Sequence, residues 1–169
     1  MFKLIITASV ASFFFGLFGV DWNAVDNKID KEFPNIGFIS SDELFGLYNT
    51  AAELPIIIDV RESDEYQVSH LNSALNIQTG AAVASQVPDK ETEIVVYCSV
   101  GYRSAGVAAE LESLGYTNVR NLRHSIFEWA NVGKPMINSD GHTSAAHPFN
   151  RAWGSLLNSE LHQYNRLPE

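Results

Sequence analysis

One cysteine stands where a thiol could act as a nucleophile. Cys98 follows residues 93–97, a short apolar run typical of a buried strand, and precedes residues 105–114, a segment of helix formers that ends at Gly115. In an open α/β sheet, ligands bind at the carboxyl ends of the strands. A helix N-terminus and outward-turned loop amides at that edge lower the pKa of a thiol. The pattern therefore favours a reactive thiolate over a small buried apolar residue.

The elements that must position Cys98 alternate along the chain. Apolar and β-branched runs predict strands at 56–60, 74–77, 93–97 and 118–122. Helix-forming segments lie between them, with capping boxes expected at 40–43 and 125–128 and with Ser63 as another cap. Alternation of this kind predicts an α/β fold in which helices flank both faces of a central parallel sheet.

Composition excludes several classes of function. The chain has 169 residues, enough for one domain with short appendages, and a formal net charge of −9, which argues against nucleic acid as a partner. No glycine-rich phosphate loop or dinucleotide fingerprint is present, so no cofactor is expected. His142, His147 and His162 lack the spacing of a metal site, so we expect no metal.

The amino-terminal residues predict a targeting segment. Residues 4–20 carry no charge, Lys3 precedes them and Asp21 follows, which would place the acidic side outside. The only pattern of small residues that suits cleavage lies at 9–11, inside the apolar run. We therefore expect 1–21 to be an uncleaved signal anchor, with a cleaved signal peptide or a helix packed on the domain as alternatives. Either targeting role makes the protein extracytoplasmic (periplasmic), membrane-anchored or secreted.

The remaining regions are expected to be a connector at 22–35, the folded domain at 36–138 and a carboxyl-terminal extension at 139–169. Residues 22–33 have an amphipathic pattern, and Pro34 breaks it. In the extension, apolar residues at 153, 156, 157 and 161 predict one helix with an apolar stripe folded back on the domain. An exposed helix that docks a partner is the alternative.

Four stretches, in order, resemble the rhodanese family of single-domain sulfurtransferases over about residues 38–137. They are Ile57-Ile58-Asp59-Val60-Arg61 with Glu65-Tyr66, then His70 with Ala74-Leu75-Asn76-Ile77, then Val96-Tyr97-Cys98 with Gly101 and Arg103-Ser104, and finally Leu114-Gly115-Tyr116 to Phe127-Glu128-Trp129. The resemblance implies a three-layer rhodanese-like domain. His124-Ser125 stand where the family commonly carries paired glycines.

The resemblance implies sulfur transfer through a covalent intermediate. Cys98 would attack the outer sulfur of a donor such as thiosulfate, and the resulting persulfide would pass to cyanide, a small thiol or a protein thiol. Four residues separate Cys98 from Arg103. Resembling phosphatases and arsenate-reducing relatives have five, which cradle a tetrahedral oxyanion, whereas the smaller ring suits a single sulfur atom.

The loop residues would share the handling of that sulfur. They are Ser99, Val100, Gly101, Tyr102, Arg103 and Ser104. Their backbone N–H groups would hold the anionic sulfur, and Gly101 permits the turn. Val100 and Tyr102 are expected to point outward and set donor preference. Arg103 would either contact the donor or brace the loop through a carboxylate.

Four residues outside the loop are expected to support it or to lie at its mouth. Asp59 and Arg61 are interpreted as a structural ion pair, rather than as an acid and a base. His70 is interpreted as a hydrogen-bonded framework residue. His124 would be a surface residue on a loop, or would crowd the pocket or offer a proton beside the thiolate.

The leading hypothesis is thus an extracytoplasmic sulfurtransferase. A non-enzymatic sulfur carrier or redox-docking module acting on a partner protein is the alternative. A phosphatase-like hydrolase is disfavoured by the length of the loop.

Overall fold

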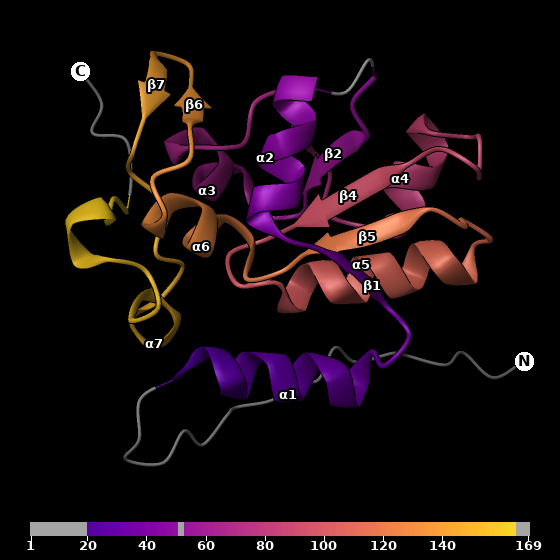
Figure 1. Ribbon diagram of the computed structural model, residues 1–169, viewed down its shortest axis with the longest axis horizontal. Helices are drawn as coiled ribbons and strands as arrows, with labels where there is room; N and C mark the ends of the chain where they lie inside the picture. Colours follow the sequence, from indigo (N-terminus) through magenta and orange to yellow (C-terminus); the bar gives the residue numbers. More distant parts are fainter. Residues whose placement is uncertain (1–19, 51–52, 165–169) are drawn as a thin grey trace, which may run out of the picture.

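A parallel sheet forms the centre of the molecule in the computed structural model, which describes residues 20–50 and 53–164. Its strands are β1 (Gly37–Ile39), β2 (Ile56–Asp59), β3 (Leu75–Asn76), β4 (Ile94–Tyr97) and β5 (Val119–Leu122). They lie in the order β1-β5-β4-β2-β3, and every neighbouring pair is parallel. The predicted α/β fold with a central parallel sheet is confirmed, and β4, which ends next to Cys98, is the central strand (Figure 1).

Helices cover both faces of the sheet. The described residues form the helices α1 (Trp22–Glu32), α2 (Ser41–Thr50), α3 (Ser63–Val68), α4 (Gly80–Gln86), α5 (Tyr102–Ser113), α6 (Ser125–Asn131) and α7 (Arg151–Gly154). One apolar cluster joins Ile57 and Val95 to α2 and α6, and the other joins Ile58 and Val96 to α4 and α5. Successive strand residues point to opposite faces, so the continuous β-branched runs fill both clusters.

Three predictions about helix starts meet different outcomes. At α2 the capping box is confirmed, because Ser40 Oγ accepts from the Glu43 amide at 3.2 Å and Glu43 Oε2 accepts from the Ser40 amide at 2.9 Å. At α3 the cap is Glu62 rather than Ser63, which is already helical. At α6 the expected box at 125–128 is wrong, since the cap residue His124 is left-handed and Ser125 binds elsewhere.

The extension is less regular than its sequence pattern predicts. An antiparallel hairpin of β6 (Met136–Asn138) and β7 (Gly141–Thr143) follows the sheet. The single helix expected near the end is replaced by α7, only four residues long, and by a 3₁₀ turn at Ser159–Leu161. Leu157 is nonetheless buried in the core, so the segment does fold back on the domain.

The amino-terminal prediction falls mostly outside the described residues, which begin at Val20. Asp21 caps α1 by accepting the Ala24 amide at 2.7 Å. Across 20–50 and 53–164, no helix is long and apolar enough to cross a membrane. The segment expected to be a connector is helical at α1, which lies beside α5 and close to α7 (Figure 1).

Candidate active site

The Cys98 thiol lies at the carboxyl end of β4, beneath the turn that leads into α5. The Gly101 amide donates to Sγ at 3.2 Å, and the Ser104 hydroxyl lies 3.5 Å from Sγ. Gly101 has a φ of 104°, a left-handed conformation that glycine adopts at little cost. The turn therefore folds back so that an N–H group faces the sulfur, as the sequence predicts for the loop.

The surroundings of Cys98 favour its charged form. Burial alone raises the pKa of the Cys98 thiol. The Arg103 charge lowers this pKa, as do hydrogen bonds from the Ser104 hydroxyl, the Ser104 amide and the Gly101 amide, and together they outweigh the effect of burial. The net shift of this pKa is downward from the ordinary cysteine value. The site therefore favours the thiolate, which is the nucleophilic form, more than an ordinary cysteine environment does.

A carboxylate that the sequence analysis did not assign to the site holds the loop from α3. Glu65, 2 % exposed, accepts from both terminal nitrogens of Arg103 at 2.8 and 2.9 Å and from Ser99 Oγ at 3.0 Å. Burial raises the pKa of Glu65, but the hydrogen bonds and charge of Arg103, the charge of Arg61 and the Glu62 amide together lower it by more, so the net shift of this pKa is downward. Of the two roles considered for Arg103, the geometry shows bracing of the loop through a carboxylate.

The amino end of α5 is tied to β5 through Asn121. Asn121 Nδ2 donates to the Gly101 carbonyl at 2.8 Å, and the Ser104 hydroxyl lies 2.7 Å from Asn121 Oδ1. A hydroxyl carries one hydrogen, so the Ser104 hydroxyl donates to Asn121 Oδ1 in one orientation and to Cys98 Sγ in another. Asn121 therefore fixes both the turn at Gly101 and the position of the Ser104 hydroxyl.

The backbone of Cys98 is fixed from the other side by the start of α6. The Cys98 amide donates to Ser125 Oγ at 3.1 Å, and the Cys98 carbonyl accepts from the Ile126 amide at 3.2 Å. Ser125 in turn donates to the Leu122 carbonyl at 3.1 Å. Ser125 thus positions the nucleophile rather than capping its own helix.

Comparison with known proteins decides the family. The protein-family model of the rhodanese-like domain matches residues 42–132 of the sequence, which is more than half of the chain. The chain belongs to the rhodanese-like domain family.

Curated relatives of this rhodanese-like chain are named as sulfurtransferases. Thiosulfate sulfurtransferase PspE of Escherichia coli is 39 % identical over 67 residues, which are 38 % of this chain and 64 % of PspE. A sulfurtransferase of Allochromatium vinosum is 32 % identical over 88 residues, covering 51 % of this chain and 81 % of that protein. The chain spans less than two thirds of PspE and 19 % of the Candida albicans adenylyltransferase and sulfurtransferase UBA4.

Solved structures agree on the fold. The thiosulfate sulfurtransferase of Pseudomonas aeruginosa superposes with a TM-score of 0.59 at 23 % identity, covering 79 % of this chain and 26 % of that one. The Alr3790 protein of Anabaena gives 0.55 at 22 % identity, covering 59 % and 81 %. At these identities the superpositions establish the rhodanese-like fold.

Val100 does not point outward as predicted, and Tyr102 does so only in part. Val100 is 5 % exposed and belongs to the apolar cluster that includes Ile29 of α1. Tyr102 is half-buried, and its hydroxyl donates to Glu32 Oε2 at 2.5 Å. The prediction fails for Val100 because α1 lies over this part of the rhodanese-like loop, whereas Tyr102 keeps part of its side chain exposed beside α1.

Asp59 and Arg61 form an ion pair, as their sequence interpretation requires. The Arg61 Nη2 and Asp59 Oδ2 atoms are 2.6 Å apart, and both side chains are fully buried at the end of β2. The same Nη2 donates to the Ser69 carbonyl at 2.6 Å. The pair therefore ties β2 to the segment after α3, the helix that carries Glu65.

The two histidines singled out in the sequence both have side-chain partners. His70 Nδ1 lies 2.9 Å from the Tyr66 carbonyl, and its ring stacks on the Tyr66 ring, as expected of a framework residue. His124 is not a free surface residue, because its two ring nitrogens lie 3.1 Å from Asp26 Oδ1 and 3.2 Å from Glu128 Oε1. His124 thus joins α1 to α6.

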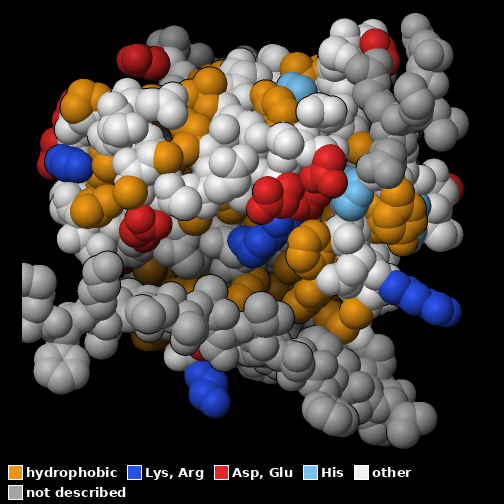
Figure 2. Space-filling model, turned by 180° about the vertical axis from the view of Figure 1, so that it is seen from behind, with side chains coloured by type: hydrophobic (Ala, Val, Ile, Leu, Met, Phe, Trp, Pro, Cys, Tyr) orange, Lys and Arg blue, Asp and Glu red, His pale blue; other side chains and the backbone are white. Residues whose placement is uncertain are grey.

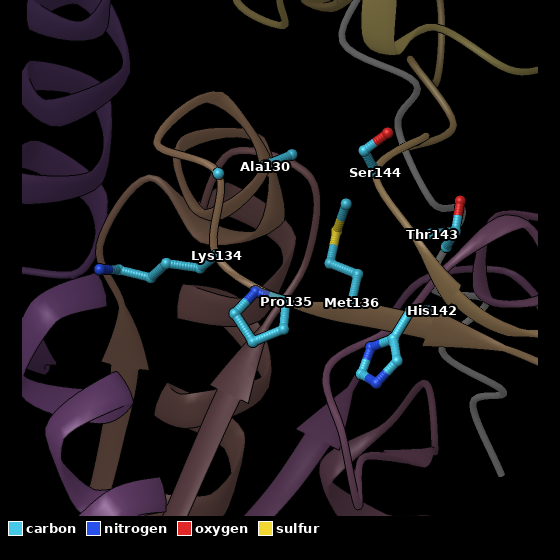
Figure 3. A pocket seen from close by; sticks show the side chains of 8 residues that line it. Ala130, Lys134, Pro135, Met136, His142, Thr143 and Ser144 are labelled. Atoms are coloured by element: carbon cyan, nitrogen blue, oxygen red, sulfur yellow. The ribbon is translucent and has the colours of Figure 1, made fainter.

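The surface offers a hollow away from Cys98. It has a volume of about 350 Å³ and is lined by residues between Ala130 and Ser144. Figure 3 shows Met136 beside it, whereas Lys134 extends away, toward its ion pair with Asp42 at 2.6 Å. In the part of the chain that the structure describes, no group of three or more His, Cys, Asp or Glu side chains is arranged to hold a metal.

Proposed function

We propose that the protein is a sulfurtransferase that carries sulfane sulfur on Cys98. The observation that carries the proposal is the 3.2 Å contact from the Gly101 amide to Cys98 Sγ beside Arg103, whose charge lowers the pKa of the thiol. Such a site holds one anionic sulfur atom at the end of a strand and the start of a helix. The sulfurtransferase names of PspE and of the Allochromatium vinosum relative support the same activity.

The reaction consists of two displacements at sulfur. The Cys98 thiolate attacks the outer sulfur of thiosulfate, a sulfur–sulfur bond forms, and sulfite leaves with the electron pair of the bond that breaks. The outer sulfur of the persulfide is then attacked by cyanide or a thiolate, and Cys98 leaves as thiolate. Each step starts from an anion, and the lowered pKa of Cys98 favours its thiolate, so the reaction assigns no general base, in keeping with the structural roles of His70 and of the Asp59–Arg61 pair.

The cationic groups near Cys98 favour an anionic donor on an otherwise acidic protein. The chain has a net charge of −9, and Figure 2 shows acidic side chains gathered beside a basic one on its back face. Arg103 retains 30 % side-chain exposure while paired with Glu65. Attraction of the donor therefore depends on this local charge and the loop amides, rather than on the overall field of the protein.

Intact mass measurement of the full chain tests the proposal. Thiosulfate treatment is expected to add one sulfur atom at Cys98, and cyanide is expected to remove it as thiocyanate. Cys98→Ser keeps the shape of the side chain and is expected to reduce both steps to the level seen without protein. Sulfur transfer that survives in Cys98→Ser would overturn the proposal. A persulfide that discharges only to one partner protein would instead identify a sulfur carrier.

We further propose that residues 1–21 direct the domain out of the cytoplasm. The support is the uncharged run at 4–20 between Lys3 and Asp21. Fractionation of bacteria that express the full chain is expected to place it in the periplasm or the inner membrane. Phe14→Lys interrupts the apolar run and is expected to retain the chain in the cytoplasm, and an unchanged distribution would contradict the assignment.

A further inference from the structure

The Cys98 side chain is closed off from solvent. Cys98 is only 1 % exposed, although a displacement at sulfur requires the donor to approach Sγ directly. Two segments that lie outside the matched residues 42–132 contact the loop around it. One is α1, and the other places the ring of Phe149 4.5 Å from the guanidinium carbon of Arg103.

The inner face of α1 rests on the loop. Val25 and Ile29 are each 1 % exposed and lie one helical turn apart, so they form a single apolar ridge. A Cβ placed on Gly101 would lie 3.5 Å from Ile29 Cδ1, which shows how closely this side chain approaches the turn over the sulfur. Phe33, just after α1, packs its ring against Tyr102 with centroids 5.8 Å apart.

The edges of α1 are held by polar and aromatic contacts that remain partly exposed. Asp26 pairs with Arg123 and with His124, both at 3.1 Å, and the Trp22 and His124 rings stack with centroids 4.3 Å apart. At the other end Glu32 accepts from Tyr102. Exposed ion pairs contribute little each, so α1 is held less firmly than the buried sheet.

His124 links these contacts to the nucleophile. His124 and Ser125 have φ values of 56° and 50°, a left-handed conformation that costs non-glycine residues energy. The His124 side chain contacts Asp26 of α1, while the hydroxyl of the next residue, Ser125, accepts a hydrogen bond from the Cys98 amide. One strained dipeptide therefore fastens both the covering helix and the backbone of the thiol.

We propose that α1 is a lid over Cys98, seated by Val25 and Ile29 and latched on His124, and that it must swing away before Cys98 can meet a sulfur donor. The proposal rests on the proposed role of Cys98 as the reacting group. Because opening breaks only the α1 contacts, it costs less free energy than global unfolding and leaves the sheet intact. The lid thereby controls how often the thiolate is available.

The test measures the rate at which iodoacetamide alkylates Cys98 in the full chain, so it does not depend on sulfur transfer. Ile29→Ala weakens the seat and is expected to raise the rate by about tenfold or more. His124→Gly removes the latch at a position where glycine relieves the backbone strain, and is expected to raise the rate by roughly fivefold. This second variant keeps the test decisive if Ile29→Ala folds poorly.

Two controls separate lid opening from other routes to the thiol. Leu44→Ala removes a fully buried side chain from α2, which packs on α6 and lies outside the cluster that contains Cys98, and it is expected to change the rate by less than about twofold. Phe149→Ala tests the second covering segment and is expected to have a smaller effect than Ile29→Ala. Unchanged rates in both lid variants would overturn the proposal, as would an equal rise in Leu44→Ala, which would indicate global unfolding.

Discussion

Two arginine–carboxylate pairs lie near the active loop, and they differ in exposure and in their relation to the sulfur. Arg61 and Asp59 have fully buried side chains, and Arg61 donates to Asp59 and to the Ser69 carbonyl, while its buried Nη1 has no hydrogen-bond partner among the described residues. Arg103 and Glu65 are 30 % and 2 % exposed, and the Arg103 charge lowers the pKa of Cys98. The same pair of chemical groups thus serves the framework in one place and the reactivity of the thiol in the other.

The degree of burial explains why the two pairs have different roles. A fully buried ion pair has lost its hydration on both sides, so each partner depends on the other and neither is available to a substrate. Arg103 keeps contact with solvent and lies close to the loop, so its charge acts on the sulfur as well as on Glu65. Three substitutions test this comparison.

The largest expected effect is on the buried pair. Asp59→Ala leaves the Arg61 guanidinium buried without its counter-ion and is expected to lower the free energy of unfolding by about 3–5 kcal/mol. Urea unfolding measures this loss. Glu91→Ala removes an exposed carboxylate and is expected to stay within about 0.5 kcal/mol of the original chain. A loss for Asp59→Ala as small as that of the control would show that the pair is not structural.

A smaller loss is expected at the loop pair, and it should depend on pH. Glu65→Gln keeps the shape but removes the charge, and should cost about 1–3 kcal/mol near neutral pH. Since the pKa of Glu65 is lowered in the folded state, its stabilisation is present above the pKa of the unfolded chain and is lost as pH falls through the folded pKa.

The difference in the free energy of unfolding between the original chain and Glu65→Gln should therefore shrink as the pH falls. Urea unfolding at a series of pH values measures this difference. Asp64→Asn, on the neighbouring exposed residue, serves as the matched control for removal of a carboxylate charge. A gap for Glu65→Gln that stays constant with pH would show that Glu65 is uncharged or unpaired in the fold.

The smallest effect distinguishes the two arginines by their action on the thiol. Arg103→Gln removes the charge beside Cys98, so the pKa of the thiol should rise toward the ordinary cysteine value. The rate of iodoacetamide alkylation at pH 6.5 should then fall, by less than about tenfold, and the midpoint of the pH profile should move upward. Asp59→Asn is expected to leave that midpoint in place. An equal shift of the midpoint in Arg103→Gln and Asp59→Asn would show that the two pairs do not differ in their effect on the thiol.

Local patterns predicted the sheet and the position of the thiol. The β-branched run at 56–60 and the apolar run at 93–97 form the two central strands, because such runs are buried on both faces of a parallel sheet. β1 was not predicted, since a strand of three residues leaves too short a pattern. The hairpin of β6 and β7 was missed for the same reason.

Contacts between distant residues could not be read from spacing. Glu65 lies 38 positions from Arg103, and Asn121 lies 17 positions from Ser104, so only the folded sheet edge shows these pairings. Glu65 belongs to a stretch that resembles the rhodanese family, which indicates that it matters but does not identify its partner. The amphipathic pattern of α1 predicted a buried face but not that the active loop would lie beneath it.

Cys98 is the only cysteine of the chain, and its closed position has a consequence for oxidation chemistry. With no second thiol in the same chain, a sulfenate or persulfide on Cys98 cannot collapse to an internal disulfide, so only another molecule can restore the thiolate. An exposed, low-pKa thiolate would be readily oxidised to irreversible acids by peroxide. The burial of Cys98 limits the access of peroxide to the sulfur.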